Sequence, residues 1–421
     1  MMGLTLEIFA TICFGLALLH TFSVKKFQHL ALRYKEGSVG ENFFHLLGEI
    51  EVVFGLWASL FLIYLGVTKG ASSAIHYLEN QNFTEPAFVF VIMTVCSTRP
   101  VLQVATRLIE RFSMLLPFKG QVSFYLSCLI IGPLLGSFIT EPAAMTVTAL
   151  ILLERFYKKG ISNKLMYATL GLLFVNISIG GTLTPFAAPP VLMVASKWNW
   201  DFAFMLQHFG WRALIAICLS TILTTLRFQS ELVKMKHTQL KNSHLTTPFW
   251  ISAIHLIFLI GIIAASHHIT VFICLFLLFL GLVRVTQEFQ DEIKLRESLL
   301  VGFFLGGLVV LGAPQRWWLE SLLTQLDSFH LYLGCIGLTA ITDNAALTFL
   351  GSLIPNLSES SKYALVAGSV VGGGLTVIAN APNPAGYGIL NASLGKEGIN
   401  PIQLFLNALI PTLIAGFCFW I

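Results

Sequence analysis

Charged residues are scarce in this sequence of 421 residues. Asp, Glu, Lys and Arg make up 11% of it, against roughly 25% in an average soluble domain. Apolar residues account for 56%, and the mean hydropathy is +0.79. So few charges cannot cover the surface of a soluble protein of this length, and many apolar runs reach the roughly 20 residues that a membrane-crossing helix needs. The composition therefore predicts an all-α, multi-pass membrane protein.

Other absences exclude classes of function. The seven cysteines form no C-x-x-C pair and no Cys/His cluster, so we interpret them as small buried hydrophobes. The net charge of +4 comes from bases in short loops, and no basic face is long enough to follow nucleic-acid phosphates. The sequence contains no P-loop motif, which argues against an ATP-driven pump. We therefore expect no cofactor and no nucleic-acid partner, and we expect the lipid bilayer to surround the chain.

The apolar runs predict about ten membrane-crossing helices. Their expected spans are 4–22, 43–66, 86–105, 165–196, 211–227, 248–266, 269–286, 298–313, 363–392 and 401–420. Two further apolar stretches, 122–152 and 331–355, are interrupted at their centres, and we interpret them as re-entrant hairpins. The first run has no preceding base and no small-residue cleavage site, so we expect a retained helix rather than a signal peptide.

Lys and Arg predict the orientation of these helices. With the N-terminus outside, 19 of the 25 bases fall in loops expected inside and 5 in loops expected outside, while Arg99 lies within a span. This bias agrees with the positive-inside rule, and we expect the cell inner membrane as the location. The polar stretch 228–247 is expected to be a cytoplasmic linker between two halves, 1–227 and 248–421.

The polar residues within the apolar runs form a pattern that appears twice. Residues 139–146 read ITEPAAMT and residues 341–348 read ITDNAALT. Each copy is followed by a glycine-rich stretch, GGTLTPFA at 180–187 and GGGLTVIA at 372–379. Each half has five expected crossings and one hairpin, and an odd number of crossings inverts the second half relative to the first. The pattern therefore predicts an inverted-topology repeat, with broken helices at 165–196 and 363–392.

Glu141 and Asp343 are the main candidates for function. A carboxylate within the membrane is costly and normally faces a polar cavity, so two equivalent acids should converge on one site. Oxygen donors suit a hard cation such as Na⁺, and Thr140, Thr342 and Asn344 supply more of them. The carboxylates are equally able to bind protons, and competition between Na⁺ and H⁺ would suffice for exchange. The alternative is a capping role, because Thr-Glu-Pro and Thr-Asp-Asn are both good helix starts.

The helix breaks supply further candidate ligands. Glycine lets the backbone leave helical geometry, and carbonyl groups freed within a membrane are tolerated only around a cavity. The alternative is a packing kink without a ligand. The candidate ion- or substrate-binding residues of the breaks are Asn176, Gly180, Gly181, Thr182, Thr184, Gly372, Gly373, Gly374, Thr376 and Asn380.

Three charged residues lie outside the repeats. Glu49 and Glu51 begin a long apolar run and are candidates for a proton path or an accessory cation ligand; the alternative is that they lie at the membrane interface. Arg99, alone in its span, could pair with Glu49 or Glu51 or hold an anionic substrate. A structural ion pair or a side chain that snorkels to the interface is the alternative for Arg99.

At the repeats, over 122–196 and 331–392, the chain resembles the ion transporter superfamily of arsenite permeases, citrate and dicarboxylate carriers and one type of bacterial sodium/proton antiporter. More narrowly, GEIEVVFG at 48–55, STRP at 97–100 and ANAPNP at 379–384 resemble a bacterial family of proposed sodium/proton antiporters. The resemblance implies two inverted repeats, each with a hairpin and a broken helix, and a homodimer.

One departure from the superfamily bears on the substrate. Its carboxylate carriers have Ser-Asn-Thr at the hairpin tips, whereas this chain has Thr-Glu-Pro at 140–142 and Thr-Asp-Asn at 342–344. Acids favour a cation over a dianion, so we expect a secondary sodium/proton antiporter with small cations as substrates. The alternative is a sodium- or proton-coupled carrier of an organic or inorganic anion. An intramembrane aspartyl protease is disfavoured because no Asp follows a Gly, so we expect no enzyme.

Overall fold

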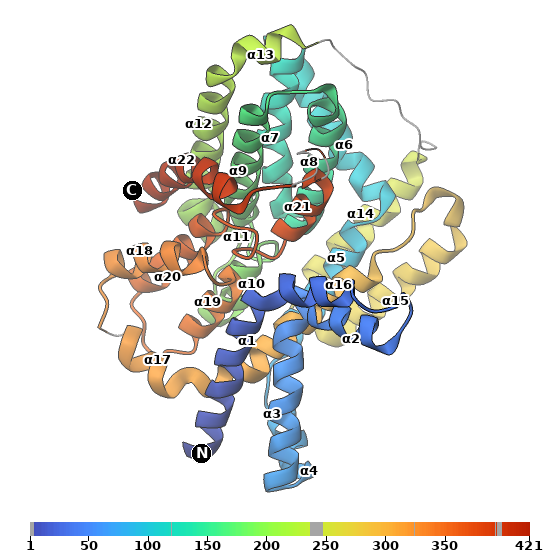
Figure 1. The fold of residues 1–421 in the computed structure, drawn as a ribbon. Helices are drawn as coiled ribbons and strands as arrows, with labels where there is room; N and C mark the ends of the chain where they lie inside the picture. Colours follow the sequence, from blue (N-terminus) through green and yellow to red (C-terminus); the bar gives the residue numbers. More distant parts are fainter. Residues whose placement is uncertain (1–3, 119, 236–246, 324, 392, 394–397) are drawn as a thin grey trace. The chain divides into compact units, whose positions relative to one another are not determined.

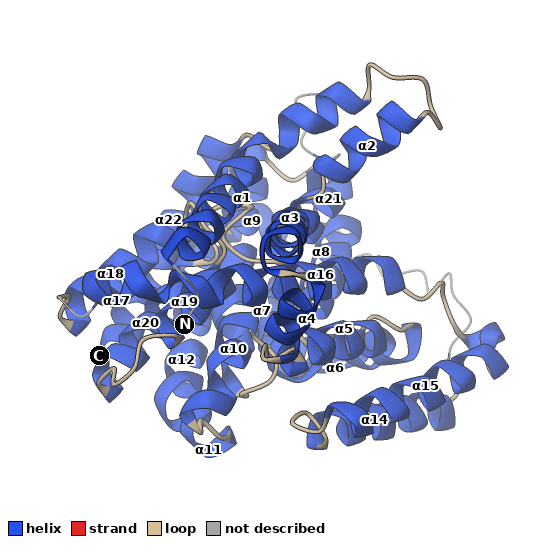
Figure 2. Ribbon diagram, turned by 90° about the horizontal axis from the view of Figure 1, so that it is seen from below, coloured by secondary structure: helices blue, strands red, loops and turns tan. Residues whose placement is uncertain are grey.

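The computed structural model describes residues 4–118, 120–235, 247–323, 325–391, 393 and 398–421, and every regular element in these ranges is a helix (Figures 1 and 2). The described residues form two compact units that alternate along the chain. Unit 1 comprises Met1–Phe90, Leu295–Leu326 and Phe349–Leu357, and unit 2 comprises Val91–Lys294, Asp327–Thr348 and Ser358–Ile421.

The helices of unit 1 are α1 (Leu4–Ala31), α2 (Val39–Leu47), η1 (Ile50–Val52), α3 (Val53–Lys69), α4 (Ala71–Glu79), α16 (Leu295–Gly312), η6 (Ala313–Gln315) and α17 (Arg316–Leu323). Helices α5 (Thr84–Cys96) and α19 (Asn344–Ser352) contribute to both units. Those of unit 2 are α6 (Arg99–Leu115), α7 (Gln121–Ile139), α8 (Glu141–Arg155), η2 (Tyr157–Lys159), α9 (Asn163–Gly180), η3 (Gly181–Leu183), α10 (Pro189–Trp198), α11 (Phe202–Met205), η4 (Leu206–Gly210), α12 (Trp211–Arg227), α13 (Gln229–Lys234), α14 (Phe249–Ala264), α15 (Ile269–Val285), η5 (Gln287–Phe289), α18 (Ser328–Thr339), α20 (Glu359–Gly372), α21 (Asn383–Asn391) and α22 (Pro401–Trp420).

The described helices include five that are long and apolar enough to cross a membrane, or six if a bent pair counts as one span. The five are Gln121–Ile139, Asn163–Leu183, Phe202–Arg227, Leu295–Trp318 and Pro401–Trp420. Five further apolar helical segments span only 10–17 residues, and one of them is part of α1. The chain is therefore a multi-pass membrane protein, and the expectation of about ten full crossings is met only in part.

The span expected at 86–105 is not a straight helix. Helix α5 ends at Cys96, α6 begins at Arg99, and the two are bent by 70°. Pro100 lies in the first turn of α6, and in a continuous helix its ring would clash with the carbonyl of Cys96, four residues earlier. Arg99 therefore lies at the start of α6, directly after the bend between the two helices.

The span expected at 43–66 is also divided. Helix α2 ends at Leu47, where the N–H of Gly48 bonds to carbonyls of the preceding turn. A 3₁₀ turn follows before α3 begins at Val53. Glu49 and Glu51 consequently belong to the connection between two helices. Helix α3 packs against α1, α4 and α16, and a Cβ at Gly307 of α16 would overlap the backbone of Phe54 and Gly55.

The first motif copy lies where α7 meets α8, and these two helices pack against each other and against α9 (Figure 1). Thr140 connects them with φ 68° and ψ 151°, a backbone region that a β-branched residue rarely adopts. Helix α9 has nearly all its residues buried. The break at 140 thus lies within a packed layer of helices.

The second motif copy has a different setting. Helix α18 ends at Thr339, α19 begins at Asn344, and α18 packs mainly against α20. Both copies thus interrupt a helix at the I-T-acid sequence. In the first copy, the two helices on either side of the interruption, α7 and α8, pack against each other. In the second copy, α18 packs instead against α20, the helix that precedes the second glycine-rich stretch.

The first part of the expected linker at 228–247 is helical. Helix α13 is held to the start of α9 because Glu231 accepts hydrogen bonds from the Ser162 amide, at 2.6 Å, and hydroxyl, at 2.8 Å. Four bases of the loops expected inside, Lys119, Lys236, Lys241 and Lys396, lie outside the described residues.

Candidate functional site

All four repeated stretches lie in unit 2, and a side-chain hydrogen bond joins the two halves. Glu141, the first residue of α8, is completely buried. Its Oε2 accepts a hydrogen bond of 2.8 Å from Nδ2 of Asn380, 239 residues further along the chain. Asn380 lies in the break between α20 and α21. The folding of unit 2 therefore brings the first acidic motif to the second glycine-rich break.

Asp343 lies near Glu141 but has a different environment. It is half-buried, and its Oδ1 accepts hydrogen bonds from the amides of Ala345, at 2.8 Å, and Ala346, at 3.1 Å. These bonds make it the N-cap of α19. The capping interpretation thus holds for Asp343 and not for Glu141. The two carboxylates lie close enough for their charges to repel each other.

Several buried oxygen atoms around these acids have no hydrogen-bond partner among the described residues. They are Oγ1 of Thr140, Oε1 of Glu141 and Oδ1 of Asn344, Asn380 and Asn383. Buried polar atoms normally have hydrogen-bond partners, so a group of unpaired oxygen atoms indicates a site for a ligand, such as a cation, that oxygen atoms coordinate. The described residues hold no group of three His, Cys, Asp or Glu side chains arranged for a metal ion.

Close contacts place these oxygens around one part of unit 2. A Cβ on Gly181 would touch Oε1 of Glu141, and a Cβ on Gly373 would lie 2.8 Å from Nδ2 of Asn344. Asn383 donates hydrogen bonds from Nδ2 to the carbonyl oxygens of Gly373, at 2.7 Å, and Thr376, at 2.8 Å. The backbone N–H of Asn344 donates to the carbonyl of Ala379 at 3.1 Å. The cluster thus draws on α8, the start of α19 and both glycine-rich breaks.

The glycines of the breaks are required by packing. A Cβ on Gly180 would lie 2.5 Å from the Pro133 carbonyl, and one on Gly372 would lie 2.6 Å from the carbonyl of Ile336. A Cβ on Gly374 would overlap the backbone of Val175. The structure thus gives each of these three glycines a packing role.

Two serines that sequence analysis missed hold the breaks in place. The Ser137 hydroxyl donates to the Gly180 carbonyl at 2.7 Å and accepts from the Leu183 amide at 2.8 Å. The Ser178 hydroxyl donates to the carbonyl of Val370 at 2.7 Å. A signal for Ser137 was available, because it stands four residues before Glu141 just as Thr339 stands four residues before Asp343.

Four of the five predicted threonine ligands donate to backbone carbonyls, and the fifth, Thr140, has no partner among the described residues. Thr182 donates to Ile179 at 2.7 Å and Thr342 to Leu338 at 2.8 Å. The remaining two, Thr184 and Thr376, share a pattern. Thr184 donates to the Ser137 carbonyl at 2.6 Å, and Thr376 donates to the Ala340 carbonyl at 2.8 Å. In each half, the threonine after the glycines is bonded to the end of the helix before the acid.

Asn176 is engaged in packing. Its Nδ2 donates to the Leu129 carbonyl and to Oγ1 of Thr221, both at 3.0 Å, and its Oδ1 accepts from the Ser220 hydroxyl at 3.1 Å. These bonds join α9 to α7 and α12. The buried amide is therefore satisfied by protein atoms, and we leave it out of the proposed ligand set.

The suggested pairing of Arg99 with Glu49 or Glu51 is not found among the described residues. Arg99 forms an ion pair with Asp291, with Nε at 2.8 Å from Oδ1, and donates to the Gln290 carbonyl at 2.6 Å. The bend after α5 places it beside the connection that follows α15. Glu49 instead pairs with Arg296 at 3.3 Å, an exposed contact, and Glu51 is half-buried. Arg99 therefore has a structural partner that sequence distance concealed.

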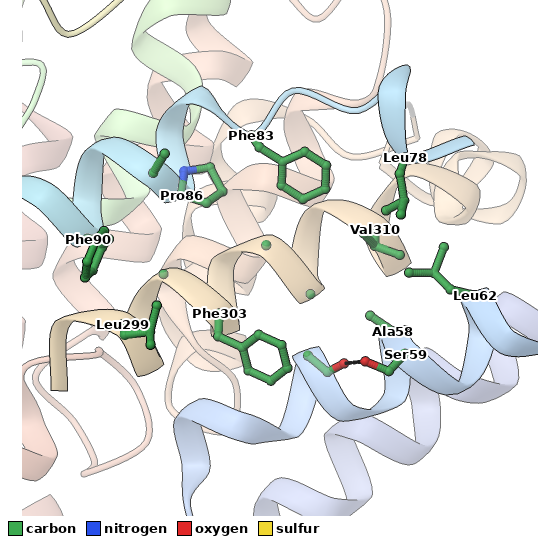
Figure 3. Close-up of a pocket in the computed structure, with 15 residues that line it drawn as sticks. Ala58, Ser59, Leu62, Leu78, Phe83, Pro86, Phe90, Leu299, Phe303 and Val310 are labelled. Atoms are coloured by element: carbon green, nitrogen blue, oxygen red, sulfur yellow. Dashed lines mark hydrogen bonds between the residues drawn. The ribbon is translucent and has the colours of Figure 1, made fainter. Parts of the chain in front are cut away.

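Unit 1 contains a cavity of about 400 Å³ between α3, α16 and the segment around Phe83 and Phe90 (Figure 3). Its lining is apolar apart from the Ser59 hydroxyl, which donates to the Gly55 carbonyl at 2.9 Å. The cavity offers no charged side chain to an ion. It is therefore a poor candidate for cation transport.

The helices define a multi-pass membrane protein, and unit 2 of it contains a cluster of buried, unpaired oxygen atoms among the described residues. A family model described as "Putative Na+/H+ antiporter" matches residues 5–421, and the chain belongs to this family. No curated protein matches the chain. Membership extends over both halves of the chain, including the connections that carry no repeated motif.

Proposed function

We propose that the chain exchanges Na⁺ for H⁺ as a secondary antiporter and that Glu141 and Asp343 bind the two ions alternately. The observation that carries the proposal is the state of Glu141. This carboxylate is completely buried, one oxygen is bonded to Asn380, and the other has no hydrogen-bond partner among the described residues. A buried charge of this kind needs a counter-charge, and none of the described Lys, Arg or His side chains forms an ion pair with Glu141.

The proposed sodium ligands are oxygen atoms. Glu141 and Asp343 supply the charge, and Thr140, Asn344 and Asn380 add buried oxygens that have no other partner among the described residues. Hard cations prefer such donors. Two carboxylates that repel each other are relieved either by a cation between them or by a proton on one of them. Both ions therefore compete for the same charge, which is the requirement for coupled exchange.

We also propose that residues 1–227 and 248–421 are inverted repeats and that the two breaks serve one site. Matching bonds support this: Thr184 and Thr376 each bond to the end of the helix that precedes an acid. The bond from Asn380 to Glu141 further supports a site shared by the two halves. Helix α7 packs against α8, whereas α18 packs mainly against α20. This difference suggests that the two motif copies contribute unequally to the ion site.

Exchange in reconstituted vesicles tests the proposal. The full chain is placed in vesicles with a trapped pH-sensitive dye, and Na⁺ is added outside. We expect Glu141→Gln and Asp343→Asn each to reduce the sodium-driven pH change by about 100-fold or more, because losing one member of a buried charged site typically costs 3–5 kcal/mol. The same vesicles are tested with Li⁺, K⁺ and a panel of carboxylates.

Two matched variants control for charge and for capping. Glu154→Gln removes an exposed acid from the same helix as Glu141, and Asp327→Asn alters the exposed cap of α18 as Asp343→Asn alters that of α19. Both are expected to exchange normally. Retention of sodium-driven exchange by the Glu141→Gln, Asp343→Asn double variant would overturn the proposal, and uptake of a carboxylate in place of cation exchange would replace it.

A further inference from the structure

A groove in unit 2 has a composition that the ion site does not explain. It encloses about 340 Å³ between α9, α12 and α22. We call it the α12–α22 groove, and its lining includes Ala168, Leu223, Arg227, Leu406, Asn407 and Ile410. One end carries a guanidinium group, and the remainder is more than half aliphatic, with Ser220, Thr224 and Asn407 as its polar members.

Local packing explains why the groove exists. Helices α9 and α22 approach closely at Gly171, where a Cβ would lie 2.7 Å from the backbone of Asn407 and Ala408. One turn earlier on α9, Ala168 presents only a methyl group. Because Ala168 is small, the space beside α22 is not filled by α9. The groove is therefore a consequence of two small residues at a tight helix crossing.

The groove has basic residues at one end. Arg227 is exposed, its guanidinium lies 5.3 Å from the ring centre of Phe228, and none of the described acids forms an ion pair with it. Lys164 is also exposed and stands four residues before Ala168, on the same face of α9. The neighbouring acid, Glu231, accepts hydrogen bonds from the amide and hydroxyl of Ser162 and keeps its own negative charge. Two bases and one acid leave this end of the groove with a net positive charge.

The aliphatic part of the groove is open. Leu406 and Ile410 expose 56% and 55% of their surface, and Leu223 exposes 46%. Apolar surface on a membrane helix is covered by hydrocarbon chains, whereas Arg227 and Lys164 attract anions. A free anion would leave the aliphatic part uncovered, and a lipid without net charge would leave the two bases without a counter-charge. Only a molecule with both an anionic group and a hydrocarbon chain matches both ends.

We propose that the α12–α22 groove binds an anionic phospholipid, with its phosphate at Arg227 and Lys164 and an acyl chain along Leu223, Leu406 and Ile410. The groove adjoins α12 at Ser220, which also bonds to Asn176 of α9. Bound lipid would therefore contact α12, the helix that is hydrogen-bonded to α9 just before the first glycine-rich break. The proposal concerns lipid binding and does not depend on which ion is transported.

Binding to the purified full chain in neutral detergent tests it. Native mass spectrometry compares phosphatidylglycerol with phosphatidylcholine of the same acyl chains. We expect wild-type protein to prefer phosphatidylglycerol and Arg227→Ala to weaken that binding about fivefold, as expected for one base near an anionic headgroup. Arg227→Lys should restore most of the affinity. Ala168→Phe should weaken the binding of both lipids by filling the groove.

The controls separate the groove from general charge effects. Arg107→Ala removes an equally exposed base from α6 and should bind like wild type. Glycerophosphoglycerol, the headgroup without chains, should bind at least about tenfold more weakly, since burial of each methylene contributes to affinity. Equal binding of phosphatidylglycerol by wild type and Arg227→Ala, an Arg107→Ala effect of the same size, or equal binding of the two lipids by wild type would overturn the proposal. Thermal unfolding of each variant verifies that it is folded.

Discussion

Glu141 and Asp343 occupy matching positions in two copies of one motif, yet their side chains have different partners. Asp343 accepts two backbone amides of α19, whereas Glu141 accepts a side-chain amide from the other half of the chain. The residue after each acid differs as well: the backbone N–H of Asn344 donates to the Ala379 carbonyl, whereas Pro142 has no N–H to donate. A repeated sequence thus produces two chemically distinct acids.

Thr140 adopts a strained backbone conformation beside the buried acid. Its φ of 68° with ψ of 151° falls in a region that is nearly restricted to glycine. We predict that Thr140→Gly raises the free energy of unfolding by about 1 kcal/mol, because relief of about 1–3 kcal/mol of strain exceeds the 0.5–1 kcal/mol entropic cost of glycine. Thermal unfolding in detergent measures the change.

Thr140→Ala is the matched control for this prediction. It removes the same hydroxyl but retains the Cβ, so the strain remains. Both variants are expected to lower the apparent affinity for Na⁺ in the vesicle assay, because both lose the buried Oγ1. A glycine variant no more stable than the alanine variant would show that the conformation at this position is not strained.

At the scale of elements, the helix breaks are places where backbones touch. The second glycine-rich stretch lies against α9 at Val175 and Ser178, and the first lies against α7 at Pro133 and Ser137. In the first break the Gly180 carbonyl accepts from the Ser137 hydroxyl, and in the second the Gly373 and Thr376 carbonyls accept from the Asn383 amide. Close packing and polar side chains together stabilise backbone that has left helical geometry.

We predict that Gly374→Ala destabilises the protein by about 1–3 kcal/mol or more, as overpacking of a filled interior does. The added Cβ would overlap the backbone of Val175 and separate the second break from α9. The midpoint temperature of unfolding and the rate of sodium-driven exchange are measured for the same variant, and both values are expected to fall.

Gly388→Ala is the matched control in the same half of the chain. This glycine lies within α21, and a Cβ there would meet nothing within 4 Å. Its replacement should leave exchange unchanged and stabilise the helix by about 0.5–1 kcal/mol. Similar losses of stability in the two variants would contradict a contact-specific effect at position 374.

At the scale of the whole molecule, the compact units do not follow the order of the sequence. Unit 2 takes both motif copies and both glycine-rich stretches, while unit 1 takes helices from the start of the chain and from 295–326. Residues far apart in sequence are therefore joined in one body that contains every proposed ligand of the ion site.

The expected orientation across the membrane yields a test at this scale. We predict that a cysteine at position 159 is protected from a membrane-impermeant maleimide added to intact cells, whereas one at position 69 is labelled. Lys159 and Lys69 are both exposed and lie in loops expected on opposite sides. The variants Lys159→Cys and Lys69→Cys are made with the exposed Cys274 replaced by Ser. Labelling of position 159 alone would reverse the predicted orientation.

The sequence by itself determined the class of protein and the positions of the interruptions. Apolar run length and the scarcity of charge indicate membrane helices. Both are properties of the sequence that do not depend on how the helices pack. Glycine and proline likewise act through the backbone of their own segment, and the ends of α7, α9 and α20 fall inside the repeated stretches, while α18 ends two residues before one. The bend before Arg99 had a local signal in Pro100, which run length alone concealed.

Only the tertiary structure decided which polar groups meet. The Glu141–Asn380 bond, the Ser178–Val370 bond and the Arg99–Asp291 pair each join residues about 190 or more positions apart. Neither residue type nor spacing specifies such partners, because they follow from how helices pack into unit 2. Packing also decided that Asn176 is satisfied by protein atoms, whereas Oε1 of Glu141 has no partner among the described residues. The candidate ion site is thus made of motifs that are visible in the sequence, brought together by contacts that are not.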